Sequence, residues 1–279
     1  MTVHNNQIVN AVSVLSERSG KNCVKKTCGG CRNCVGLKGA IYEYIKRKIH
    51  KRLLGKVSLY ITPSLFMKNL IEEAGFYPVE HIPNGFSLFK YSKMVNYNRI
   101  LYVGRLSKEK GVNYLIKAMP NVLSVHKDAK LVIVGDGPEK DSLLELTKKL
   151  SLNNNISFRS SSTRKDIETF YRNSTILIVP SVYDDNFPTV VIEAMGIGRP
   201  VIGSYRGGIP ELIENKVTGT FLRDVTSSEI SKVIVSLLGS RATINKYSKH
   251  ANIKSKNFSL DINAKSIEKI YERLREKDV

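Results

Sequence analysis

The stretch RILYVGRLSKEKGVNYLIKAMPNVLSVHKDAKLVIVGDG, residues 99–137, decides the fold class. Two short runs of aliphatic and β-branched residues, RILYV and KLVIV, flank a segment whose apolar residues recur at helical spacing. The alternation continues with NISF (155–158), TILIVP (175–180) and PVIGS (200–204), each followed by a helical pattern. Strands that alternate with helices are typical of a parallel sheet with helices on both faces. The sequence therefore predicts one doubly wound α/β domain.

A second α/β segment precedes this domain. Residues 57–62 and 79–83 are predicted strands, and residues 64–74 form a predicted helix that begins at a serine cap. The polar stretch 90–98 is the predicted linker. These predicted strands and this helix are typical of the closing elements of another α/β lobe.

We therefore expect three parts. Residues 1–90 form a partial N-terminal lobe, residues 91–255 form a complete second lobe, and residues 256–279 contain a C-terminal helix that crosses back. A chain of 279 residues is short for two full lobes of this kind, which need roughly 350 residues. We expect the first lobe to lack its opening strands, with residues 2–4 as one inner strand.

The composition, with 42% hydrophobic and 25% charged residues, excludes a chain that is disordered throughout. The net charge of +19 favours anionic partners, including phosphates, nucleic acid or an anionic membrane surface. We expect no nucleic-acid partner, because the chain contains no recognisable nucleic-acid-reading module.

The basic residues are densest in residues 38–56, where apolar residues recur at helical spacing. This pattern predicts a basic amphipathic helix. It would either pack on its own sheet with a solvated basic face or make peripheral contact with an anionic membrane; both interpretations stay open.

All four cysteines lie close together at Cys23, Cys28, Cys31 and Cys34. Four thiolates in one loop can surround a zinc ion, so this spacing makes a structural zinc site one interpretation. Reduced cysteines that pack within the loop are the other, and an iron–sulfur cluster is less favoured. Neither a run of about 18 apolar residues nor a signal-peptide pattern is present, so we expect a cytoplasmic protein, with the inner face of the membrane as an alternative location.

The loop after the first predicted strand carries cations between two glycines. Gly104 and Arg105 begin this loop, and Lys110 stands five positions after Arg105, before the following helix. An arginine can donate to two phosphate oxygens, a lysine supplies a compact positive charge, and the start of a helix offers N–H groups. The loop predicts a diphosphate site, against the alternative of a solvated basic loop.

The turn after the second strand, GDGP, begins at Gly135. Glycine lets the backbone approach a base or a ribose closely, although many such turns bind no ligand. Both interpretations of Gly135 stay open.

The segment PSVYDDNFPTVVIEAM, residues 180–195, carries two acids eight positions apart across a strand-to-helix turn. Glu193 falls on an apolar helix face, where a carboxylate needs hydrogen-bond donors, and a ribose diol supplies two. Asp185 is expected to contact the transferred sugar, with an Asx turn as the alternative. The predicted nucleotide-binding set also takes in the turn and the helix start: Asn186, Phe187, Pro188, Thr189 and Val190.

Together GRLSKEKG, DNFPTVVIEAMGIGRPVIGS and YRGGIPELI resemble motifs of family 4 glycosyltransferases. The resemblance covers nearly the whole chain. It implies a GT-B fold with two Rossmann-like lobes, the C-terminal donor lobe complete and the N-terminal acceptor lobe truncated. It also implies transfer of a sugar, with retention, from a nucleotide-diphosphate donor.

The resemblance extends to individual residues. It implies that Arg105 and Lys110 hold the donor diphosphate, that Glu193 binds the ribose and that Asp185 contacts the sugar. Aspartate stands at position 185 where the family has glutamate. His4 resembles the histidine that lies beside the reacting centre in the family, so the expected catalytic set is His4, Asp185 and Glu193.

The resemblance implies a glycan or lipid-linked acceptor in surface polysaccharide synthesis. No metal is expected for the chemistry, because cations and helix N–H groups neutralise the leaving diphosphate. The alternative is a nucleotide-sugar-binding fragment that does not turn over, because its acceptor lobe is incomplete.

Overall fold

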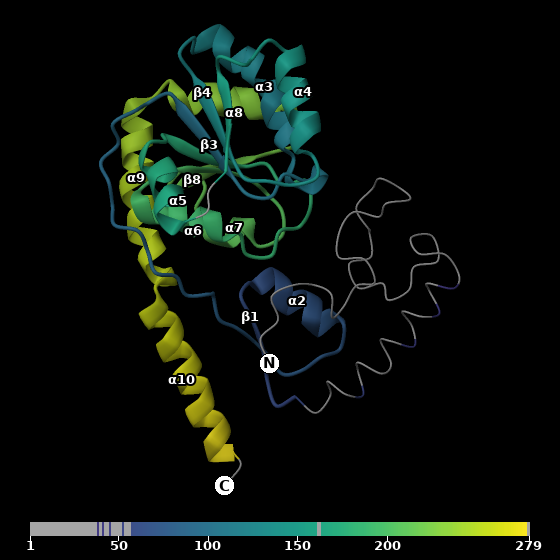
Figure 1. Ribbon diagram of the computed structural model, residues 1–279. Helices are drawn as coiled ribbons and strands as arrows, with labels where there is room; N and C mark the ends of the chain where they lie inside the picture. Colours follow the sequence, from purple (N-terminus) through teal and green to yellow (C-terminus); the bar gives the residue numbers. More distant parts are fainter. Residues whose placement is uncertain are drawn as a thin grey trace. The chain divides into compact units, whose positions relative to one another are not determined.

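The computed structural model describes residues 57–160 and 163–277, together with the single positions Lys38, Ile41, Ile45 and Arg52 (Figure 1). The described residues form two compact units. The first comprises residues 57–85, 185–187 and 260–277, and the second comprises residues 86–184 and 188–259. Each unit is described by itself.

The second unit is built on a six-stranded parallel sheet, as the sequence predicts. Its strands follow the order β5-β4-β3-β6-β7-β8. In chain order they are β3 (Arg99–Val103), β4 (Lys130–Val134), β5 (Ile156–Arg159), β6 (Ile176–Val179), β7 (Val201–Ser204) and β8 (Gly219–Leu222). The chain therefore starts at the centre of the sheet, moves to one edge and then returns to fill the other half, which is the Rossmann order.

Helices follow these strands around the sheet (Figure 1). They are α3 (Val112–Val125), α4 (Lys140–Lys149), α5 (Arg164–Arg172), α6 (Thr189–Ile197), α7 (Ile209–Leu212), α8 (Ser227–Leu238) and α9 (Arg241–Ser255). Helices α3, α4 and α8 share one apolar core with alternate residues of the strands, such as Ile100 and Tyr102 of β3. This alternation is expected, because successive strand residues point to opposite faces.

Helix α6 is apolar on almost every side, and most of its residues are buried. It contacts β6, β7 and α9, so it lies between the sheet and another helix. A polar residue on such a helix has few partners available, which makes the environment of Glu193 informative.

The first unit contains the parallel pair β1 (Tyr60–Thr62) and β2 (Val79–His81) and the helices α2 (Leu65–Glu73) and α10 (Leu260–Lys277). The Ser64 hydroxyl accepts a hydrogen bond from the Met67 amide at 3.1 Å, which confirms the predicted serine cap. Both strands are shorter than predicted. One face of the pair packs on α2, and the other packs on apolar residues of α10.

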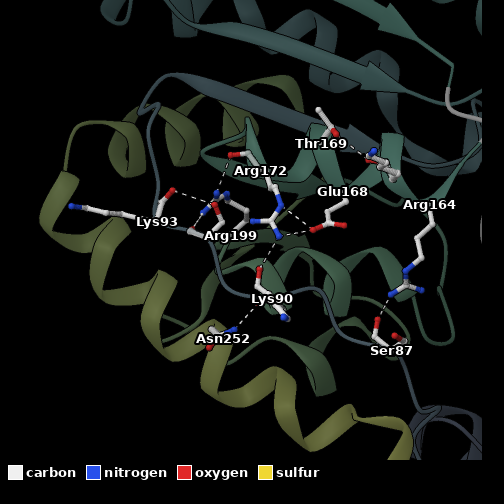
Figure 2. Close-up of polar contacts among 12 residues, drawn as sticks. Ser87, Lys90, Lys93, Arg164, Glu168, Thr169, Arg172, Arg199 and Asn252 are labelled. Atoms are coloured by element: carbon white, nitrogen blue, oxygen red, sulfur yellow. Dashed lines mark hydrogen bonds and ion pairs between the residues drawn. The ribbon is translucent and has the colours of Figure 1, made fainter.

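The predicted linker lacks helix and strand, but it is not free of the second unit. We call residues 86–98 the connecting segment. Phe89 and Met94 in it are buried, and Met94 belongs to the main core. Three arginines donate to its carbonyl groups: Arg164 to Ser87, Arg172 to Lys90 and Arg199 to Ser92 (Figure 2). The connecting segment therefore packs on the second unit through buried apolar side chains and through hydrogen bonds to its backbone carbonyl groups.

Arg199 is the most unusual of these anchors because its side chain is fully buried. It donates to the carbonyl oxygens of Tyr171 at 3.0 Å, Arg172 at 2.9 Å and Ser92 at 2.9 Å. Burial lowers the pKa of Arg199 to about 10, so the guanidinium stays charged at neutral pH. One side chain thus satisfies carbonyls of both α5 and the connecting segment.

Replacement of this anchor predicts a large loss of stability. Arg199→Met should lower the free energy of unfolding by about 3 kcal/mol or more, because buried carbonyls lose their charged donor. Urea unfolding followed by circular dichroism measures this loss. Arg223→Met removes the same charge from an exposed site and should change little; equal losses in both variants would contradict the anchoring role.

Candidate nucleotide-binding site

The strand order fixes where a ligand should bind in the second unit. Strand β3 pairs with β4 on one side and with β6 on the other, so the chain leaves the sheet centre in opposite directions. Open α/β sheets bind ligands at this switch point, beyond the carboxyl ends of the strands. The loops after β3 and β6 therefore form the candidate site.

The loop after β3 lies against the loop after β6. Gly111 has a left-handed φ of 69°, and a Cβ there would lie 2.1 Å from the carbonyl oxygen of Pro180. The Val182 amide donates to the Glu109 carbonyl at 2.9 Å. Only glycine fits at position 111, both for its backbone angle and for the close approach of the neighbouring loop.

The predicted diphosphate ligands both lie in this loop. Arg105 is exposed, and Lys110 ends a short 3-10 helix (Lys108–Lys110). The Lys110 ammonium lies 5.0 Å from the centre of the Tyr183 ring. The 3-10 turn lies within the loop, and α3 begins two residues after it, at Val112.

The glycine turn after β4 packs on the same loop. A Cβ at Gly135 would lie 1.9 Å from the carbonyl oxygen of Gly104, and the Leu106 amide donates to the Asp136 carbonyl at 2.8 Å. Lys140 lies 2.7 Å from the Asp136 carboxylate and lowers the pKa of this group. The close backbone packing explains Gly135 without a ligand, so its contact with a base or ribose stays a prediction.

The loop after β6 is tied to the loop after β7, since Asp184 accepts a hydrogen bond from the Gly207 amide at 3.2 Å. Asp185 is buried and, with Asn186 and Phe187, belongs to the first unit. Asn186 accepts a hydrogen bond from Ser64, the residue that caps α2.

Helix α6 begins at Thr189, with Pro188 as its cap residue. Its first residues, Thr189 and Val190, are partly exposed, as is Glu193 one turn later. The Glu193 Oε2 atom accepts a hydrogen bond from the Tyr171 hydroxyl at 2.9 Å. We expect this carboxylate to need hydrogen-bond donors, and Tyr171 supplies one from within the protein.

Several predicted residues lie outside the part of the chain that the structure describes: His4, Cys23, Cys28, Cys31 and Cys34. Their catalytic and metal-binding roles stay predictions. Within the described residues, no group of three His, Cys, Asp or Glu side chains is placed to hold a metal ion.

Most of the predicted basic helix, residues 38–56, also lies outside the described residues. The four described positions in it are helical and exposed, and Ile41 and Ile45 are more than half exposed. Across the described residues, no helix is long and apolar enough to cross a membrane.

Sequence reasoning missed Tyr171, Tyr183 and Arg199. Tyr171 lies in a helical pattern that carries no motif, and Arg199 looks like an ordinary surface arginine in the sequence. The only available signal was the acid on the apolar face of α6, which requires a donor without identifying it.

A cavity of about 350 Å³ lies elsewhere on the second unit. Its lining includes Arg99 and Lys130, the first residues of β3 and β4, and none of the residues predicted to bind the nucleotide sugar. Since ligands of such sheets bind at the carboxyl ends of the strands, the loops after β3 and β6 remain the better candidate.

The chain is similar to several known glycosyltransferases. An uncharacterized glycosyltransferase of Methanocaldococcus jannaschii is 39% identical over 123 residues, which are 44% of this chain and 31% of that protein. The lipopolysaccharide 1,2-N-acetylglucosaminetransferase of Salmonella typhimurium is 30% identical over 189 residues, 61% of this chain and 50% of that enzyme. The chain thus spans a third to a half of the length of these relatives.

Among solved structures, HepE of Anabaena in complex with UDP is 25% identical, with a TM-score of 0.72. The match covers 81% of this chain and 67% of HepE. A model of the family described as glycosyl transferases group 1 matches residues 86–254. This match includes more than half of the chain and all the strand-end loops of the second unit, so the chain belongs to the group 1 glycosyl transferases.

Proposed function

We propose that the second unit binds a nucleoside-diphosphate sugar and that the protein transfers the sugar with retention to a glycan or lipid-linked acceptor. The contact between the loops after β3 and β6 carries this proposal. It holds Arg105 and Lys110 at the switch point of the sheet, where a diphosphate would meet two cations. The UDP named in the HepE complex supports a nucleotide of this class.

Each part of the donor has a proposed partner. Arg105 and Lys110 neutralise the diphosphate as it leaves, the first amides of α6 at Thr189 and Val190 add N–H donors, and Glu193 accepts from the ribose hydroxyls. We retain Asp185 as the sugar contact and His4 as the residue beside the acceptor on the family resemblance.

The acceptor is proposed from the relatives. The Salmonella relative is named for lipopolysaccharide, and another relative of 35% identity, from Erwinia amylovora, is named for amylovoran biosynthesis. These names favour a glycan acceptor, and we propose a growing surface glycan as its class. The second candidate function is nucleotide-sugar binding without transfer, since the described residues of the candidate site are all ones predicted to bind the donor.

The first prediction concerns the diphosphate. Arg105→Ala and Lys110→Ala should each weaken the binding of UDP or GDP by about 1 to 3 kcal/mol, because each removes a charge-assisted contact. Calorimetry on the full chain measures this. Lys117→Ala removes the same charge from the exposed side of α3 and should bind as the parent does. Parent-like affinity in both loop variants would remove the diphosphate role.

The second prediction separates transfer from binding. With a UDP-sugar and a glycan acceptor, the parent should release UDP and form a product that keeps the anomeric configuration of the donor. Glu193→Ala should lose at least tenfold in transfer, since the ribose loses its acceptor. Product analysis by NMR measures the configuration. An inverted product would contradict the retaining mechanism, and donor binding without any product would favour the second candidate.

A further inference from the structure

The Glu193 Oε2 atom accepts a hydrogen bond from the Tyr171 hydroxyl at 2.9 Å, and within the described part of the chain this is the one side-chain partner of the carboxylate. The carbonyl oxygen of Val190 is also near this hydroxyl, at 3.4 Å. A hydroxyl has one proton to donate, and the shorter distance and the charge of the acceptor both favour Glu193. The neighbours of Glu193 on α6, Ile192 and Ala194, are fully buried and offer no polar side-chain atom.

Tyr171 is itself held on several sides. Its side chain is fully buried, and the Phe89 ring of the connecting segment packs against it with centroids 6.1 Å apart. Arg199 donates to its carbonyl at 3.0 Å, and the Ser174 hydroxyl donates to the same oxygen at 2.8 Å. Burial, and then the charge of Glu193, raises the pKa of Tyr171 well above its usual value, so the hydroxyl keeps its proton.

The connecting segment completes this arrangement. The Arg164 guanidinium lies over the Phe89 ring, 4.5 Å from its centroid. The same arginine donates to the Ser87 carbonyl (Figure 2). Arg199 joins the Ser92 carbonyl to the carbonyls at the end of α5. Phe89 is thereby fixed against Tyr171 by contacts that lie outside the predicted donor residues.

We propose that Tyr171 is a positioning residue for the donor nucleotide: it fixes the Glu193 carboxylate so that the remaining acceptor sites of this group receive the ribose hydroxyls. This inference rests on the proposed function. An ionised carboxylate has about four acceptor sites, and Tyr171 occupies one, which leaves enough for a diol. A carboxylate that is held in one orientation loses less conformational entropy when the ribose binds.

The competing explanation is that Glu193 only satisfies a buried tyrosine of the core. The two explanations differ in how ligands respond. A core tyrosine affects stability and all ligands alike, whereas a positioning residue affects the part of the ligand that Glu193 contacts. We define ribose discrimination as the ratio of the Kd for the 2′-deoxy nucleotide to the Kd for the ribonucleotide. A change in this ratio separates the two explanations.

The experiment titrates the full chain with UDP and 2′-deoxy-UDP, or with the guanosine pair if GDP binds more tightly. Tyr171→Phe keeps the ring and removes the hydroxyl. It should weaken UDP binding by roughly twofold to tenfold, because the Glu193 side chain must then be ordered when the ribose binds. The ribose discrimination should fall toward that of Glu193→Ala.

Tyr247→Phe is the matched control, because it removes a hydroxyl from another buried tyrosine of the second unit, in α9. It should keep the discrimination of the parent. Phe89→Leu is a second test variant, since it removes the ring that packs on Tyr171 without altering a residue predicted to bind the nucleotide sugar. It should lower the discrimination in the same direction, and it keeps the test available if Tyr171→Phe folds poorly.

The outcomes separate this inference from the proposed function. If the parent binds neither nucleotide, or if Glu193→Ala keeps the discrimination of the parent, the ribose role of Glu193 in the proposed function is wrong. If Glu193→Ala loses the discrimination while folded Tyr171→Phe and Phe89→Leu keep it, the positioning role is overturned and the proposed function stands. A similar loss in Tyr247→Phe would also overturn the positioning role.

Discussion

The close approach of the loops after β3 and β6 is the constraint on which the candidate site depends. Because β3 and β6 are neighbours in a parallel sheet, their carboxyl ends lie at the same edge, and the loops that follow them lie close together. Gly111 makes this possible, since any Cβ there would collide with the Pro180 carbonyl. The same approach brings Lys110, a predicted diphosphate ligand, to the Tyr183 ring.

A second constraint acts through polar groups in an apolar setting. Helix α6 is buried on most sides, and the carboxylate it carries must find a donor there. Tyr171 supplies the donor, and Arg199 satisfies the carbonyl of the same tyrosine. These hydrogen bonds therefore connect the connecting segment, α5 and α6. The series of contacts ends at Glu193, the predicted ribose ligand.

Much of the fold could be predicted from local patterns. The alternation of short apolar runs with helical periods predicts the parallel sheet, and α10 lies within residues 256–279, where a C-terminal helix is expected. The pairing of Tyr171 with Glu193 could not be predicted, because the two residues are 22 positions apart on different helices. The burial of Arg199 was equally inaccessible, since an arginine before a proline gives no sign of which carbonyls surround it.

We expect a nucleoside diphosphate to bind between the loops after β3 and β6, and a crystal structure of the full chain with UDP would measure this. The diphosphate should lie within hydrogen-bond distance of Arg105 and Lys110, and the ribose hydroxyls should lie on Glu193 with the Tyr171 contact retained. UDP bound instead in the cavity beside Arg99 and Lys130, with the loops after β3 and β6 empty, would contradict it.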